Sequence, residues 1–239
     1  MKLRVTFSLI AALGALLLGV AGCGGGSSSA GPASFAPAKS PVFIEGVIRP
    51  SGELKANVDR VVEKIAGIEN LGDFLIEKAE ASFKEQGESF DYATEVEPWL
   101  GEEAGVFLGG FDGNNFSEVG VGVQVTDAGA AQHFIDERAK SNSGQPLETR
   151  SYQGVEYKVD PSDDTSLGVV GDFVVFGQNE QAFKDAVNAS SGESLADEER
   201  FSNAIAGATD GSLANVYVDI GRLIDESGGK IEPEARKIL

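Results

Sequence analysis

The chain is poor in the residues that carry most enzyme chemistry. Its 239 residues include one cysteine, Cys23, and one histidine, His133. A single thiol rules out an internal disulfide and a cysteine-rich zinc site. The Gly-x-Ser-x-Gly motif of many serine hydrolases is also missing. We therefore expect no metal site, no cofactor and no catalytic site, and interpret the protein as a non-enzyme.

Basic residues are scarce as well. The sequence has 19 lysines and arginines against 38 aspartates and glutamates, which gives a net charge of −19. Such an excess of acid repels the phosphates of nucleic acids, and no cluster of basic residues interrupts it. Nucleic acid is therefore excluded as a partner, and we interpret the acidity as a means of keeping the protein soluble.

The clearest positive signal surrounds Cys23. Lys2 and Arg4 precede an apolar stretch at 5–19, which is shorter than the roughly 20 residues of a membrane-spanning helix. The small residues Ala21 and Gly22 directly before Cys23 resemble the lipobox of bacterial lipoproteins. We predict that residues 1–22 are a cleaved signal peptide, and that lipid on Cys23 holds the protein on the extracytoplasmic face of the cell membrane. An uncleaved anchor and an ordinary secretory signal are the alternatives.

A segment of small and polar residues follows the cysteine. From Gly24 to Pro41 the chain is rich in glycine, serine, alanine and proline. Such a composition is typical of a flexible linker. We therefore predict a lipidated cysteine and linker at 23–41 and a folded domain at 42–239.

The folded part alternates pairs of strands with helices. Adjacent strand pairs favour a mostly antiparallel sheet, so we predict an α+β fold with helices packed on one face. Asn179 and Ser194 are expected to cap two of the helices. The predicted strands are 42–48, 104–111, 119–125, 148–159, 166–177 and 213–220, and the predicted helices are 54–67, 70–87, 127–140, 179–190 and 194–205.

The C-terminal end carries no stop signal. A new helix starts at 221–225, and residues 231–239 are still patterned when the chain ends. We therefore expect that the domain is incomplete at its C-terminus.

One segment resembles a known family. Glu97-Pro98-Trp99-Leu100-Gly101, followed by a strand, is similar to the hallmark of the bacterial family called domain of unknown function 3352. The start at 40–46 and the strand at 213–219 also resemble that family, so the likeness covers most of 41–225 in order. The family carries no established activity, and the resemblance therefore implies no catalytic residues.

Trp99 has two interpretations. Between a proline and a glycine it suits a buried plug that joins a helix to the next strand. The alternative is an exposed platform, shared with Phe90 and Tyr92, for a sugar or an apolar ligand.

Two acidic loops and the histidine are weaker candidates for a functional site. The loops at 112–115 and 160–164 lack the alternating ligands of a strong calcium motif, so we interpret both as turns. His133 is followed by Glu137 four residues later, which is typical of a solvated helix surface.

These observations favour a lipid-anchored envelope protein whose domain binds a protein or small-molecule partner. One alternative is a carrier that holds an apolar ligand in a sheet-lined pocket, since the chain has 14 phenylalanines. A second alternative is a hydrolase with paired carboxylates, drawn from Glu95, Glu97, Glu102 and Glu103.

Overall fold

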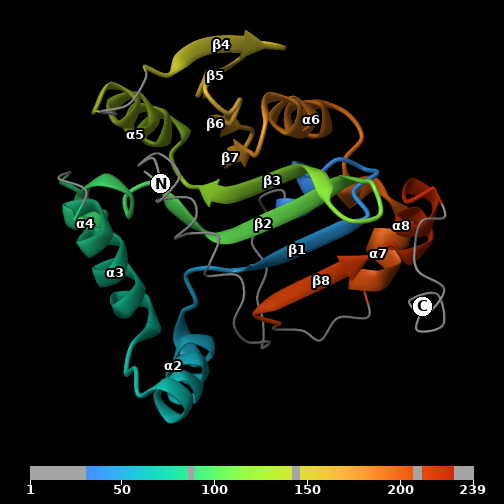
Figure 1. Ribbon diagram of the computed structural model, residues 1–239. Helices are drawn as coiled ribbons and strands as arrows, with labels where there is room; N and C mark the ends of the chain where they lie inside the picture. Colours follow the sequence, from blue (N-terminus) through green and yellow to red (C-terminus); the bar gives the residue numbers. More distant parts are fainter. Residues whose placement is uncertain (1–30, 86–88, 142–145, 207–211, 229–239) are drawn as a thin grey trace.

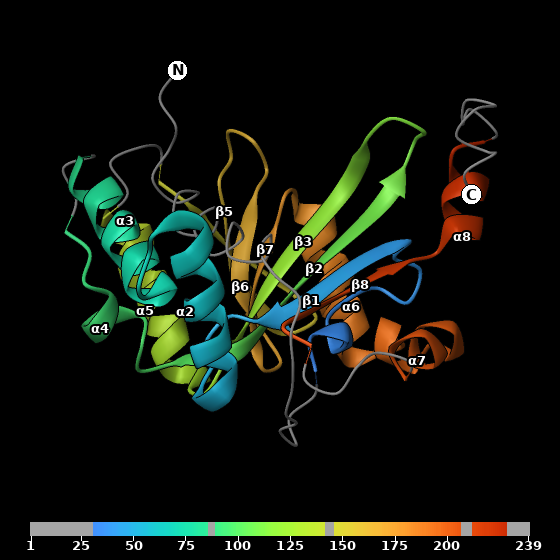
Figure 2. The same cartoon turned by 90° about the horizontal axis from the view of Figure 1, so that it is seen from below.

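A single eight-stranded antiparallel sheet organises the protein (Figures 1 and 2). The computed structural model describes residues 31–85, 89–141, 146–206 and 212–228. The strand order is β4-β5-β6-β7-β3-β2-β1-β8. The α+β class with an antiparallel sheet is thus confirmed. The strands are β1 (Val42–Val47), β2 (Leu100–Phe111), β3 (Phe116–Val125), β4 (Glu148–Tyr152), β5 (Val155–Val159), β6 (Ser166–Val170), β7 (Phe173–Gly177) and β8 (Ala214–Val218).

Helices follow the strand pairs much as the sequence predicts. Gly67 ends α2 in the left-handed conformation, and the Asn179 side chain accepts a hydrogen bond from the Ala182 amide at the start of α6. Ser194 and Asp197 form the expected capping box. The helices are η2 (Pro32–Ser34), α2 (Gly52–Ala66), α3 (Leu71–Glu85), α4 (Tyr92–Glu95), α5 (Ala128–Ser141), α6 (Glu180–Ser191), η3 (Leu195–Asp197), α7 (Glu199–Ile205) and α8 (Ile220–Glu226).

Two of the segments predicted as single strands each form two strands joined by a turn. The segment 148–159 folds into β4 and β5, and 166–177 folds into β6 and β7. Gln153 and Gly154 at the first turn have φ angles of 49° and 84°, and Gly171 at the second has 57°. Positive φ at these turns reverses the chain, so the apolar runs of about twelve residues become hairpins.

The larger core lies on one face of the sheet, under η2, α6 and α7. Its fully buried aromatic side chains come from segments that are far apart in the sequence: Phe35, Phe43, Phe107, Tyr157, Phe173 and Phe183. Glycines on β2 and β3 make room for these rings. A Cβ on Gly122 would overlap the Phe35 ring, and one on Gly120 would overlap the Phe107 ring.

The predicted linker is therefore wrong over its second half. Phe35 and Ala36 are fully buried, and Arg222 Nη1 donates to the Ala38 carbonyl at 2.9 Å. This segment has the composition of a linker, but its one aromatic residue, Phe35, fills the space beside glycines of the sheet. The folded domain begins near Pro32 rather than at Val42.

A second core lies on the opposite face. Val174 and Val175 are adjacent in β7, and they belong to different cores because successive side chains of a strand point to opposite faces. Ala131 and Ile135 of α5 cover this second core together with Trp99. Helices α5 and α6 consequently flank β6 and β7 from either side (Figure 1). The helices thus divide between the two faces of the sheet instead of packing on one.

The hairpin of α2 and α3 is attached to the sheet only loosely. Each helix has 15 residues and a single buried side chain, Val58 in α2 and Phe83 in α3. Ile65, near the end of α2, is 81% exposed. Figure 2 shows α2, α3, α4 and α5 gathered at one end of the molecule, opposite α7 and α8.

Two sequence predictions fall outside the described residues. These are the leader with Cys23 and the patterned end at 231–239. Across the parts of the chain that are described, the helices are all too short or too polar to cross a membrane.

Candidate functional site

A cavity of about 320 Å³ opens between the α2–α3 hairpin and the part of the sheet where β1 ends and β2 begins. The end of β1 supplies its floor, α2 and α3 supply one wall, and the segment around α4 closes the other side. Most of the lining is apolar, and it comprises Val47, Ile48, Pro50, Val58, Leu71, Leu75, Ile76, Ala79, Phe90, Tyr92, Val96, Leu100 and Leu213. A volume of this size falls in the range of small-molecule sites, roughly 300–1,000 Å³.

The local sequence explains why a gap is left here. β1 ends at Val47, and Pro50, three residues later, cannot donate a backbone hydrogen bond to continue the strand, so the chain leaves the sheet before α2 begins. On α3, Leu75, Ile76 and Ala79 face the gap and are only half-buried. Because Ala79 is small, the helix face has a hollow that no opposing side chain fills.

Aromatic residues anchor the hairpin at its root. Phe83 at the end of α3 lies 4.6 Å from Phe90 between ring centroids. The Arg138 guanidinium of α5 lies 5.5 Å from the Phe83 ring and 5.2 Å from the Phe90 ring, and it also pairs with Glu95. This cluster joins α3, α4 and α5 and leaves the far end of the hairpin with few contacts.

Four of the five charged residues that line the cavity form ion pairs with one another. Arg49 donates to the Leu100 carbonyl at 2.7 Å and to the Glu97 carboxylate at 3.3 Å. Lys55 and Asp59 form an ion pair at 2.6 Å on α2. The fifth, Asp73, accepts a hydrogen bond from the Asn70 side chain at 2.6 Å, so the lining carries a formal net charge of −1.

Tyr92 adds a neutral polar group to this lining. Burial raises the pKa of its phenol, the nearby Arg49 opposes that rise, and Glu97 adds to it. The phenol therefore stays protonated at neutral pH and can donate a hydrogen bond within the cavity.

The predicted aromatic platform is divided by the structure. Phe90 and Tyr92 line the cavity, whereas Trp99 is 3% exposed and belongs to the second core. The Trp99 Nε1 donates to the Glu95 carbonyl at 2.7 Å, and its ring lies 5.5 Å from that of Phe134. Trp99 is thus a buried plug and offers no surface to a ligand.

The four glutamates considered for a hydrolase do not form a carboxylate pair. Glu95 binds Arg138 and Glu97 binds Arg49, so each is compensated by a different arginine. Glu102 is exposed, and burial raises the pKa of Glu103 on β2. His133 lies on the exposed side of α5.

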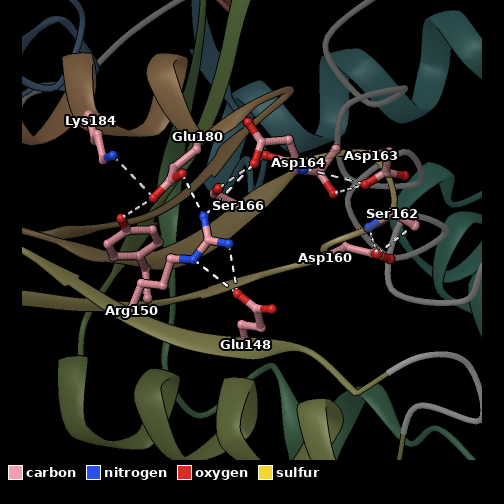
Figure 3. A network of polar contacts seen from close by, with 11 residues as sticks. Glu148, Arg150, Asp160, Ser162, Asp163, Asp164, Ser166, Glu180 and Lys184 are labelled. Carbon is pink, nitrogen blue, oxygen red and sulfur yellow. Dashed lines mark hydrogen bonds and ion pairs between the residues drawn. The ribbon is translucent and has the colours of Figure 1, made fainter.

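A network of polar contacts around Glu180 has a structural role. The Tyr157 hydroxyl donates to Glu180 at 2.6 Å, and Arg150 and Lys184 bind the same carboxylate at 2.6 and 3.1 Å (Figure 3). These bonds, the one from Tyr157 first, hold the pKa of Glu180 below its usual range. Arg150 on β4 and Tyr157 on β5 tie the start of α6 to the sheet, whereas Lys184 belongs to α6 itself.

The acidic loop beside it is a turn, as its composition predicts. Asp160 is buried and accepts from the Ser162 amide at 2.8 Å and hydroxyl at 2.6 Å (Figure 3). In the other loop, the Asp112 carboxylate accepts from two amides, those of Asn114 and Asn115. Across the described ranges, no three histidine, cysteine or acidic side chains gather as a metal site.

Sequence reasoning missed most of the cavity. Leu71, Leu75 and Ala79 follow the helical pattern of a core-facing stripe, which by itself predicts burial.

Comparisons with known proteins identify a family but no activity. No protein of curated function shows significant sequence similarity to this chain. A comparison with solved structures matches two crystal forms of the protein TP0453, with 11% identity and a TM-score of 0.41 for form I and 13% identity and a TM-score of 0.32 for form III. Form I aligns over 80% of this chain and form III over 68%, and the chain spans 63% and 54% of their lengths. The model of a family described as protein of unknown function (DUF3352) matches residues 75–236, more than half of the sequence, and the chain therefore belongs to that family.

Proposed function

We propose that this protein is a lipid-anchored envelope protein that binds an apolar, chain-like small molecule between the α2–α3 hairpin and the sheet. The observation that carries the proposal is the cavity of about 320 Å³ with its mainly apolar lining. Of the functions that the sequence suggests, the carrier is the one that such a cavity favours.

The chemistry of the lining supports an uncharged or weakly polar ligand. Arg49 and Glu97 form one ion pair and Lys55 and Asp59 another, so a charged ligand would have to compete with existing partners. An apolar chain gains free energy simply by displacing water from Leu75, Ile76 and Val58. The Tyr92 phenol is placed to donate a hydrogen bond to one polar group on that chain.

The loose attachment of the hairpin supports a route for the ligand. Since α2 and α3 each have one buried side chain, little apolar contact is lost when the hairpin moves away from the sheet. Anchoring through Cys23 would keep such a carrier beside the membrane, where apolar molecules are concentrated.

A fluorescent probe tests the proposal. The mature chain with Cys23→Ser is titrated with N-phenyl-1-naphthylamine, an uncharged apolar dye whose emission rises in apolar sites. Ala79→Trp fills the hollow on α3 and should weaken dye binding at least about tenfold. Ala81→Trp is the matched control, because Ala81 is exposed on the same helix and does not line the cavity.

Melting curves by circular dichroism establish that both variants fold. Dye binding that Ala79→Trp leaves unchanged in a folded protein would overturn the proposal. Equal loss in both variants would do so as well, because it would place the dye outside the cavity.

A further inference from the structure

The last strand of the sheet has a free edge whose sequence is unusual for an edge. β8 ends the strand order and pairs only with β1 among the described residues. Its five residues, Ala-Asn-Val-Tyr-Val, include no charge and no proline. Edge strands of soluble proteins normally carry such residues because they prevent pairing with other chains.

The opposite edge shows the usual protection. β4 contains Glu148 and Arg150, which pair with each other at 2.7 Å on the outermost strand. Thus only one of the two edges is left without charged residues.

The hydrogen-bond pattern tells which backbone groups face outward. The Val47 amide donates to the Leu213 carbonyl, and the Asp219 amide donates to the Pro41 carbonyl. In an antiparallel pair every second residue bonds to the neighbour, so Asn215 and Tyr217 point their backbone groups towards β1. The amides and carbonyls of the alternate residues, Ala214, Val216 and Val218, therefore point away from the sheet.

The same alternate residues also expose apolar side chains. Val216 is 65% exposed and Val218 is 44% exposed, and both lie on the face of the sheet opposite the larger core. Val216 lies at the middle of the strand, with Ala214 and Val218 at equal distances on either side.

Because all five residues of β8 are uncharged and its outward-facing backbone groups can pair with those of an identical strand, we infer that β8 is a pairing site for a second copy of this chain. A two-fold axis at Val216 places Val216 opposite its own copy and Ala214 opposite Val218 of the other chain. Both are hydrogen-bonded pairs in the resulting antiparallel register, so all three outward-facing residues find partners. Apolar side chains then meet across the axis on one face, and Asn215 meets Tyr217 on the other. The two sheets become one continuous sheet.

The net charge of −19 on each chain opposes this association. Added salt screens that repulsion. The dimer should therefore be stronger at high ionic strength, unlike an interface held by ion pairs.

Cross-linking tests the register. In the mature chain with Cys23→Ser, which has no other thiol, Val216→Cys should form a disulfide-linked dimer under mild oxidation. The Cα atoms of a hydrogen-bonded antiparallel pair lie about 5.5 Å apart, within reach of a disulfide. Asn215→Cys is the matched control and should stay uncross-linked, because its side chain lies on the other face and opposite Tyr217.

Sedimentation tests the interface without a disulfide. Val216→Lys places two like charges across the axis and should weaken the dimer at least about tenfold. Ser151→Lys on the β4 edge should leave it unchanged. A monomeric parent protein at high salt, a dimer that survives Val216→Lys, or equal cross-linking of the two cysteine variants would each overturn the inference.

Discussion

At the scale of single residues, the fold depends on aromatic rings that occupy space left by glycines. Phe35 lies in a segment that resembles a linker, and its ring fills the position where a side chain on Gly122 would be. The same relation holds for Phe107 and Gly120. Such pairs link parts of the chain that are distant in sequence, and no local pattern reveals them.

A double-mutant cycle tests the packing of Phe35 against Gly122. Phe35→Ala should cost about 3–5 kcal/mol of unfolding free energy, as for other large aromatic deletions in cores. Gly122→Ala alone should also destabilise, because its methyl group overlaps the ring. In the double variant the overlap is gone, so its free energy of unfolding in urea should fall close to that of Phe35→Ala. Simple additivity of the two losses would show that the residues do not compete for one space.

The Glu180 network predicts an acid-sensitive part of the stability. The hydrogen bond from Tyr157, with smaller effects of Lys184 and Arg150, lowers the pKa of Glu180 in the folded state. The pKa of a glutamate in the unfolded chain is about 4.3. Because the pKa is lower in the folded state, the ionised Glu180 stabilises the fold at pH values above about 4.3, and this contribution is lost as the pH falls through the folded-state pKa.

Glu180→Gln should therefore destabilise the protein at pH 7 and have a smaller effect near pH 3. Urea midpoints measured against pH for the two proteins give the comparison. With Tyr157→Phe, which removes the largest cause of the shift, the acid-induced loss should begin at a higher pH. Parallel pH profiles for the parent and Glu180→Gln would refute this assignment.

At the scale of elements, the sequence predicts where helices and strands lie better than how they pack. The caps at Asn179 and Ser194 and the left-handed Gly67 fix helix ends through local bonds, which is why their positions are predictable. The turn at Gln153-Gly154 was not predicted, because the residues on both sides of it have the pattern of one continuous strand. The cavity was missed because an apolar stripe on α3 gives the same pattern whether it meets a core or an empty space.

Hydrogen exchange should distinguish the loosely attached hairpin from the rest. Helix α6 buries Ala182, Phe183, Ala186, Val187 and Ala189, while α2 and α3 bury one side chain each. We expect amides in α2 and α3 to exchange at least about tenfold faster than those in α6, and to slow when an apolar ligand binds. Equal protection of the three helices would mean that the hairpin is as firmly held as the core.

At the scale of the whole molecule, the start of the folded domain near Pro32 shortens the predicted tether to the eight residues from Gly24 to Gly31. Eight residues span at most about 28 Å when fully extended. A lipid on Cys23 would therefore hold the domain close to the membrane surface.

Fractionation tests the anchor itself. Cys23→Ser should move the protein from the membrane to the soluble fraction and abolish labelling by a fatty-acid probe, because it removes the thiol that we propose is acylated. Ser27→Ala, four residues further along, should leave both unchanged. Membrane partitioning that persists in Cys23→Ser would exclude Cys23 as the anchor.

The central claim is that an apolar ligand occupies the cavity between the α2–α3 hairpin and the sheet. Photo-cross-linking with a long-chain alcohol that carries a diazirine, followed by peptide mapping, tests it most directly. The account predicts labels on the cavity lining, at 47–50, 71–79 and 90–100, which are lost in Ala79→Trp and kept in Ala81→Trp. Labels concentrated on the exposed valines of β8, or spread evenly over the surface, would contradict it.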